Sequence, residues 1–181
     1  MIIASQKKKE NIAEYLLYMW QIEDIIRAYR LDIDQIQKHI INSYDLPEEQ
    51  KKSMREWYES LIDMMHSEGV EKKGHLQLNK NVLIDLTDLH LRLLKSTREP
   101  FYGAAFFKTL PYIVELRAKS GEGKTGELET CFNALYGVLL LRLQKKEIQS
   151  DTLKAIQQIS TFLSILAEKY KQEKAGELEL E

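Results

Sequence analysis

The longest apolar segment of this 181-residue chain constrains its fold most strongly: residues 130–146, with the sequence TCFNALYGVLLLRLQKK. Placed on a helix at about 100° per residue, its large apolar side chains cover one broad face, while Ala134 and Gly137 leave the opposite side small. A helix that is apolar nearly all round is buried nearly all round. We therefore expect a central buried helix at about 127–146, crossed closely by a neighbouring helix at Gly137.

The rest of the chain repeats apolar residues at i, i+3 and i+4 and contains no alternating pattern of useful length, which predicts helices and no sheet. Capping signals divide the helices, such as Asp32 with Gln35 three residues later. Pro111 predicts a kink or two short helices in its neighbourhood. We therefore expect an all-α fold: a single-domain bundle of six to seven helices, residues 1–175, followed by a frayed charged tail, residues 176–181.

Composition and charge predict a soluble cytoplasmic protein with neither nucleic acid nor membrane as a partner. The net charge is −2 and the sequence pI about 6.1, so no overall field draws the chain to anionic polymers or surfaces. The apolar run at 15–20 is far too short for a bilayer, and no hydrophobic run follows the N-terminal lysines as a secretory signal requires. The single cysteine, Cys131, can form no internal disulfide, and we expect it to be a small core residue in a reducing compartment.

Two local patterns could suggest a cofactor, and neither is convincing. Residues 118–125, AKSGEGKT, formally satisfy a relaxed phosphate-loop pattern, but that loop must follow a buried parallel strand. We interpret it as a flexible connection between helices. Asp63 and His66 lie one helical turn apart, yet the Glu-x-x-His motif of di-iron bundles is absent from the sequence. We expect no metal and no other cofactor.

The most informative polar residues lie within apolar stripes. Glu23 lies on the edge of the first helix's apolar face with Arg27 one turn later, and Arg142 lies on the main face of the central helix. A buried charge requires a partner. The simpler interpretation is an ion pair between Glu23 and Arg27 at the rim, and an Arg142 that reaches water from the last turns of its helix. The alternative is a charged network between helices that lines a binding pocket, with Tyr15 nearby.

The first helix, expected at about 5–29, is more apolar than a surface helix needs to be. Leu17 and Trp20 lie outside the main stripe that includes Tyr15 and Ile22. A two-fold axis could bury this extra surface against its own copy, with Trp20 as an aromatic anchor. We therefore expect a homodimer with Leu17 and Trp20 as interface candidates. In a monomer, the following short helix or the C-terminal tail would cover them instead.

Three stretches together resemble a known protein family: MIIASQKKKENIAEYLLYMWQIEDIIRA, LETCFNALYGVLLLRLQKKEI and AIQQISTFLSILAEKY. They are similar to a bacterial family of uncharacterised proteins of about this length, catalogued as a domain of unknown function. The resemblance covers nearly the whole chain. It implies a single all-helical domain and no established activity, and no catalytic or binding residues come with it. Besides the homodimer, an unknown protein partner is left open.

Two functional hypotheses follow from these patterns. The first is a non-enzymatic helical-bundle interaction protein that self-associates, since no catalytic set of residues is present. The second is a small-molecule-binding or catalytic bundle that uses the charges at Glu23, Arg27 and Arg142. Convergence of those charges on a closed pocket favours the second hypothesis, whereas a filled interior with charges at its rim favours the first.

Overall fold

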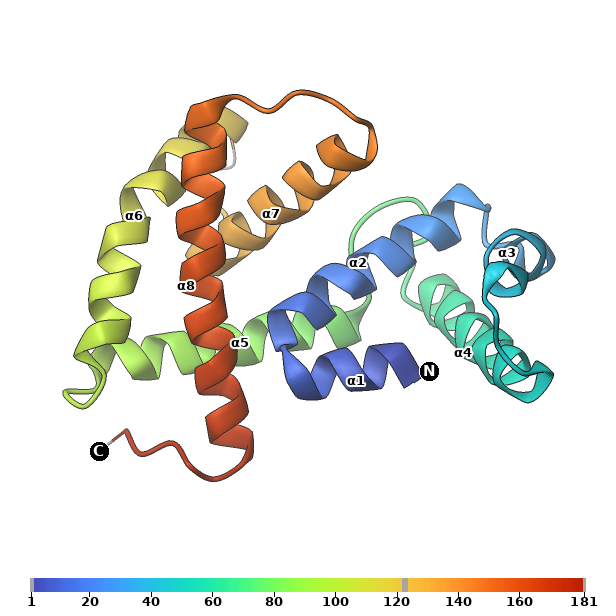
Figure 1. Cartoon of the computed structure of the whole chain (residues 1–181), viewed down its shortest axis with the longest axis horizontal. Helices are drawn as coiled ribbons and strands as arrows, with labels where there is room; N and C mark the ends of the chain where they lie inside the picture. The colour runs from blue at the N-terminus through green and yellow to red at the C-terminus, as the bar shows by residue number, and fades with distance from the viewer. Residues whose placement is uncertain (1, 122–123, 181) are drawn as a thin grey trace. The chain divides into compact units, whose positions relative to one another are not determined.

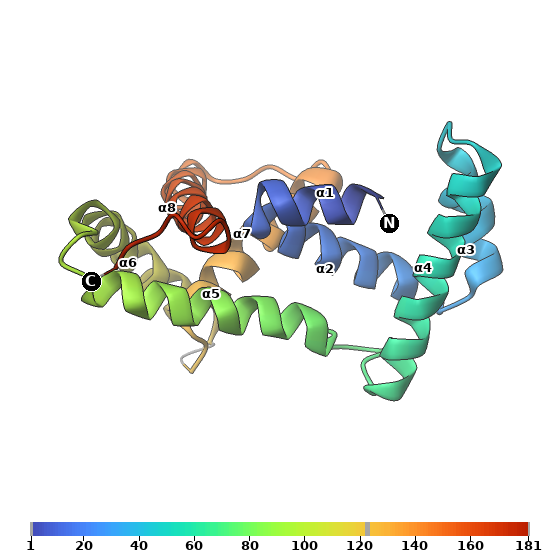
Figure 2. The same ribbon diagram turned by 90° about the horizontal axis from the view of Figure 1, so that it is seen from below.

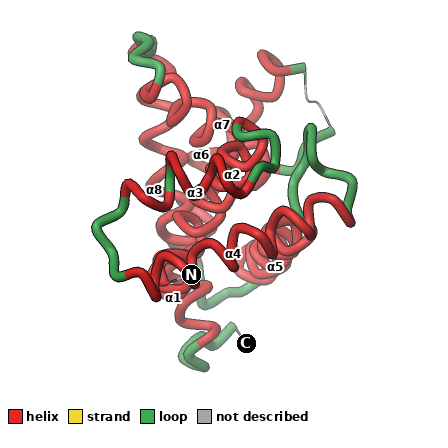
Figure 3. The backbone as a smooth tube through the Cα atoms, turned by 90° about the vertical axis from the view of Figure 1, so that its right-hand side faces the viewer, coloured by secondary structure: helices red, strands yellow, loops and turns green. Residues whose placement is uncertain are grey.

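The computed structural model describes residues 2–121 and 124–180, and the described chain is helical with no strand (Figure 3). This confirms the predicted all-α class. Eight α-helices and one 3₁₀ helix, η1, are described, in place of six or seven. In chain order they are α1 (Ile2–Glu10), α2 (Ile12–Ala28), α3 (Ile33–His39), η1 (Ile41–Ser43), α4 (Glu48–Ser67), α5 (Gln77–Lys95), α6 (Pro100–Ser120), α7 (Glu127–Leu143) and α8 (Ser150–Lys174).

The extra helix arises because the first predicted helix is interrupted at Asn11. The Asn11 side-chain oxygen accepts a hydrogen bond from the backbone N–H of Ala13, at 3.0 Å. Asparagine is a favoured residue at a helix start because its side chain satisfies an amide that has no partner within the helix. As a result α1 and α2 lie side by side and run in opposite directions (Figure 1 and Figure 2).

The helices group into two compact units. Unit 1 comprises Met1–Lys9 and Glu14–Val82, and unit 2 comprises Glu10–Ala13 and Leu83–Glu181. Helix α5 is continuous through this division. The single domain expected for residues 1–175 therefore stays a prediction. In unit 1, α3 and η1 pack against α4, and the fully buried side chains include Met19, Ile26, Ile36, Tyr58 and Met65.

In unit 2, α6, α7 and α8 pack against one another, and α8 lies beside α6 (Figure 1). Helix α8 carries buried residues along its length, from Ala155 to Tyr170. The predicted central helix corresponds to α7, whose first half is buried at Cys131 and Phe132, whereas Leu143 at its end is 66% exposed. The prediction of a close helix crossing at Gly137 was wrong, because a Cβ atom built there meets no atom within 4 Å.

Helix α6 continues through Pro111 instead of breaking there. Proline removes one N–H from a helix, and here its side chain is exposed. Nearby, the Thr109 hydroxyl is buried within the helix, where it donates to the carbonyl of Ala105 at 2.8 Å. It also accepts from the Gln158 side chain of α8 at 3.1 Å. Contact with α8 therefore supports the helix where the sequence predicted an interruption.

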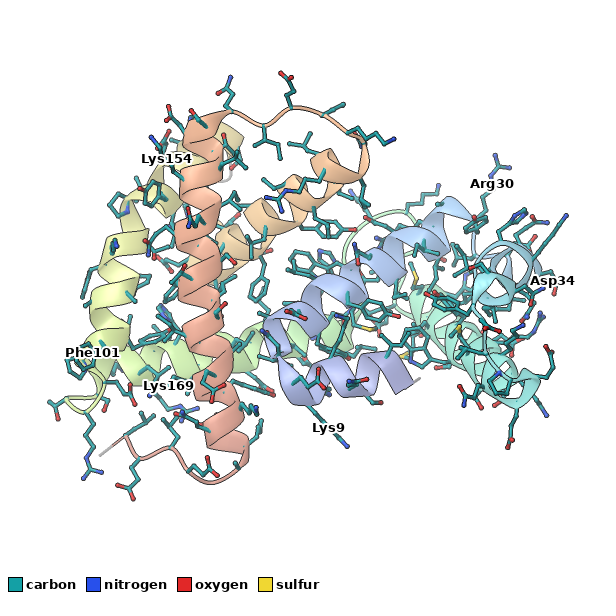
Figure 4. All side chains as sticks on the ribbon, viewed as in Figure 1. Lys9, Arg30, Asp34, Phe101, Lys154 and Lys169 are labelled. Carbon is teal, nitrogen blue, oxygen red and sulfur yellow. The ribbon has the colours of Figure 1, made fainter. Side chains whose placement is uncertain are left out.

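The junction between α5 and α6 is tied to α8 and to the C-terminal tail. Lys169 of α8, labelled in Figure 4, donates to the Glu99 carboxylate at 2.6 Å. The Ser96 hydroxyl donates to the carbonyl of Leu180 at 2.8 Å. The described part of the tail that was expected to fray, residues 176–181, is therefore irregular in conformation but attached to this turn.

Candidate functional site

The carboxylate of Glu23 on α2 is the most deeply buried charged group among the described residues. Its Oε1 accepts from the backbone N–H of Leu76 at 2.9 Å and from the side-chain amide of Asn79 at 2.6 Å. Its Oε2 lies 2.6 Å from Nδ1 of His75. All three partners come from the start of α5 and the residues just before it, so both oxygens are engaged within unit 1.

The ring of Trp20 packs against the ring of His75, the residue that also contacts Glu23. The two ring centroids are 4.3 Å apart and their planes differ by 14°, which is a stacked arrangement. Trp20 and Glu23 are three residues apart on α2 and so lie on the same face of the helix. Since Trp20 is only 3% exposed, it belongs to the interior of the chain. It therefore cannot serve as the exposed aromatic anchor expected at the interface candidates Leu17 and Trp20.

Arg27, one turn after Glu23, fixes the loop that precedes α5. Its Nη2 donates to the carbonyl of Val70 at 3.1 Å and to the carbonyl of Gly74. The backbone angle φ of Gly74 is 89°, a left-handed conformation that glycine adopts without strain. The Nη1 atom of Arg27 lies 3.0 Å from the carboxylate of Asp24. The predicted ion pair between Glu23 and Arg27 was therefore wrong: each binds a different part of the same segment.

Together these contacts make Glu23 a remote cap for α5. The first amides of a helix have no partner inside the helix, and a negative charge is favourable at that end. Glu23 satisfies the Leu76 amide, and Glu68 accepts from the Gln77 amide at 2.6 Å. Among the described residues no hydroxyl or thiol hydrogen-bonds to His75, as a nucleophile would in a catalytic triad. Both carboxylate oxygens of Glu23 are therefore in contact with residues of unit 1, and the Glu23 side chain is fully buried.

Tyr15 lies at a separate place in unit 1. It lines an open pocket of about 260 Å³ with Lys8 of α1 and with Trp57 and Leu61 of α4. The Lys8 ammonium lies 5.5 Å from the centre of the Tyr15 ring, and burial raises the pKa of the Tyr15 hydroxyl. Neither Glu23 nor Arg27 lines this pocket. The charges of α2 and the candidate tyrosine therefore do not form one site.

A wider groove in unit 1 runs between α1 and the start of α4. Its volume is about 600 Å³, and its lining is mostly apolar. Lys9 is its one charged residue among those described, so the groove carries no acid–base pair. The apolar lining residues are Ile3, Tyr44, Leu46 and Met54.

The remaining candidates occupy ordinary positions. Arg142 is exposed in the last turn of α7 in unit 2, as expected for a long side chain that reaches water. Leu17 is half-buried on α2.

Unit 2 carries a feature that the sequence analysis missed, a row of exposed apolar side chains along α6. Phe107 is 65% exposed and Val114 is 56% exposed. Phe101, labelled in Figure 4 at the first turn, is 87% exposed. The signal was present in the sequence, because exposed apolar residues recur at steps of three and four. We call the following five residues the α6 row: Ala104, Phe107, Pro111, Val114 and Ala118.

His90 and Cys131 are titratable groups buried in the core of unit 2. Nδ1 of His90 lies 2.6 Å from the Tyr102 hydroxyl, and the rings of Phe106 and Phe162 pack around it. Burial lowers the pKa of His90. Burial also raises the pKa of the Cys131 thiol to about 12. Cys131 is fully buried, which confirms it as a small core residue.

The phosphate-loop pattern at 118–125 has the wrong structural context. The residues before it form α6, a helix and not a strand, and Glu122 and Gly123 lie outside the described residues. Within residues 2–121 and 124–180, no three His, Cys, Asp or Glu side chains are grouped as metal ligands would be. In the same part of the chain, no helix has the length and apolarity needed to cross a membrane.

The fold and these sites define an all-helical protein in which Glu23 is bound by residues of its own chain and in which α6 carries Phe101, Phe107 and Val114 among the exposed large apolar side chains. The chain belongs to the family described as Domain of unknown function (DUF4924), whose model matches residues 1–177. This confirms the resemblance to a domain-of-unknown-function family. No curated protein and no solved structure matches the chain.

Proposed function

We propose that this protein is a non-enzymatic helical interaction protein that self-associates as a homodimer. The exposed row of apolar residues on α6 is the observation that supports this function most strongly. Contiguous exposed apolar surface on a soluble protein commonly marks a site of association. Glu23, the most deeply buried charge among the described residues, is bound by the chain's own amides and imidazole, which supports a structural role for it.

The homodimer therefore uses a surface other than the one expected from the sequence. Trp20 is buried against His75, whereas Phe107 and Val114 are exposed on unit 2. Large aromatic side chains are frequent anchors of protein interfaces. We further propose a cytoplasmic location, which the lone unpaired Cys131 supports, since structural disulfides are rare in reducing compartments.

A small-molecule-binding protein is the second candidate function. The apolar groove of about 600 Å³ in unit 1 supports it, since ligand pockets are commonly apolar and of this size. Such a ligand would contact both the apolar residues and the polar residues that line the groove, Lys9 among them. It would not be bound by the charges of Glu23, Arg27 and Arg142.

Native mass spectrometry of the purified protein separates these candidates. Self-association predicts species at the 21.2 kDa mass of the chain and at twice that mass, with the larger species growing as concentration rises. The second candidate predicts a retained or added small molecule on the single-chain species. A protein that stays at the mass of one chain at every concentration would contradict the proposed self-association.

A further inference from the structure

The α6 row has the spacing of a helix that packs against another helix. From Ala104 to Ala118 its members are separated by three, four, three and four residues, which places all of them on one face. The opposite face carries the buried residues Tyr102, Phe106 and Ile113, which pack inside unit 2. Helix α6 is thus apolar on two sides, and the described residues of unit 2 cover only one of them.

The row alternates small and large side chains. Ala104, Pro111 and Ala118 occupy one position of the seven-residue repeat, and Phe107 and Val114 occupy the other. In an antiparallel pair of helices, the repeat position that holds the small residues on one helix faces the repeat position that holds the large residues on the other. Each large side chain therefore meets a small one. In a parallel pair, small residues would face small ones and leave voids, which lose packing energy.

The charges beside the row also fit a second copy of the same helix. Lys108 and Glu115 lie one repeat apart on the same flank of the row, and both are exposed. When two such helices run antiparallel, Lys108 of each lies beside Glu115 of the other, which gives two identical opposite-charge contacts. Glu115 already accepts from Lys119 at 2.6 Å, so its carboxylate would lie between two ammonium groups.

We propose that α6 pairs antiparallel with α6 of a second copy of this chain. In this register Phe107 faces Ala118 of the second copy, and Pro111 faces Val114 of the second copy. When a two-fold axis relates the two chains, the same patch is used on both, so association stops at the dimer. The inference rests on the proposed self-association and specifies the surface and direction that it uses.

Phe107→Glu tests the surface, with Leu143→Glu as its matched control. The two side chains are 65% and 66% exposed in the same unit, but Leu143 lies on α7, off the row. The dimer dissociation constant, measured by sedimentation equilibrium, should rise at least about tenfold for Phe107→Glu and change less than about twofold for the control. Phe107→Ala is a second variant that keeps helix propensity, and far-UV circular dichroism verifies that each variant folds.

A charge exchange tests the register. Lys108→Glu should weaken the dimer by about two- to tenfold, because two attractive contacts become repulsive. The double variant Lys108→Glu with Glu115→Lys should recover wild-type association within about twofold. If the double variant dimerises no better than Lys108→Glu alone, the antiparallel register is wrong.

The outcomes separate the two proposals. A wild-type protein that is monomeric throughout the concentration series would overturn the proposed function itself. A wild-type dimer that is unaffected by Phe107→Glu and Phe107→Ala would leave self-association standing and overturn the assignment to α6.

Discussion

Replacing Glu23 with alanine would remove the hydrogen-bond acceptor that the Leu76 amide and the Asn79 side chain share at the start of α5. The Leu76 amide and the Asn79 side chain, both buried, donate to Glu23 at 2.9 and 2.6 Å and would lose this bond. A buried donor left without a partner costs about 1–3 kcal/mol, so the two together should lower the free energy of unfolding by about 2–6 kcal/mol. Native domains are stable by only about 5–15 kcal/mol, and the variant should therefore be close to unfolding.

Urea unfolding followed by far-UV circular dichroism measures this loss. Glu23→Gln keeps an oxygen for Leu76 and Asn79 and loses the carboxylate contact with His75, so it should cost less, about 1–2 kcal/mol. Glu14→Ala on the same helix is the control, because its pair with Lys7 is exposed and should contribute at most about 1 kcal/mol. If Glu23→Ala cost no more than Glu14→Ala, Glu23 would not be the cap that secures α5.

Three further predictions concern single residues. Cys131, with its pKa raised to about 12, should resist a thiol reagent in the native protein and react once the chain is unfolded; rapid native labelling would contradict its burial. Burial lowers the pKa of His90 below its ordinary 6.5, so the unfolded chain binds the proton more readily. Stability should therefore fall as pH decreases from 6.5 toward the lowered native value, and a urea midpoint series should show a shallower fall for His90→Phe. Gly137→Ala should raise the melting temperature, because the added Cβ meets no atom and alanine favours a helix by about 1 kcal/mol; a lower melting temperature would indicate a close neighbour there.

Apolar periodicity was sufficient to predict the all-helical class but missed the division between α1 and α2, because it records only that a helix buries one face where it packs. Periodicity does not say how much of that surface the chain covers. The run at Gly137 is apolar all round, yet the end of α7 is exposed at Leu143. Conversely, the extra apolar surface of α2 at Trp20 is covered within the chain, where Trp20 stacks on His75. Whether the neighbouring surface is filled depends on packing between distant segments.

The candidate site illustrates the same limit. Glu23 was correctly expected to need a partner, since a buried charge cannot remain alone. Its partners, His75 and Asn79, lie 52 and 56 residues away, and no local pattern connects them to α2. Pro111 was expected to give a kink or two short helices; α6 is one continuous helix, which excludes the two short helices, and its Thr109 is bound by Gln158 of α8. In both cases the outcome depends on a contact between distant segments, which no local pattern records.

A distance between spin labels on α6 would test the proposed assembly most directly. A label at Phe101, in a chain carrying Cys131→Ala, lies outside the α6 row but on the same helix. In the antiparallel register the two labels are offset by about 23 residues, or about 35 Å at 1.5 Å per residue. A double electron–electron resonance distance near that value is the predicted result. A distance of about 10 Å, as two parallel helices in contact would give, or the absence of any coupling between labels, would contradict the antiparallel pairing of α6.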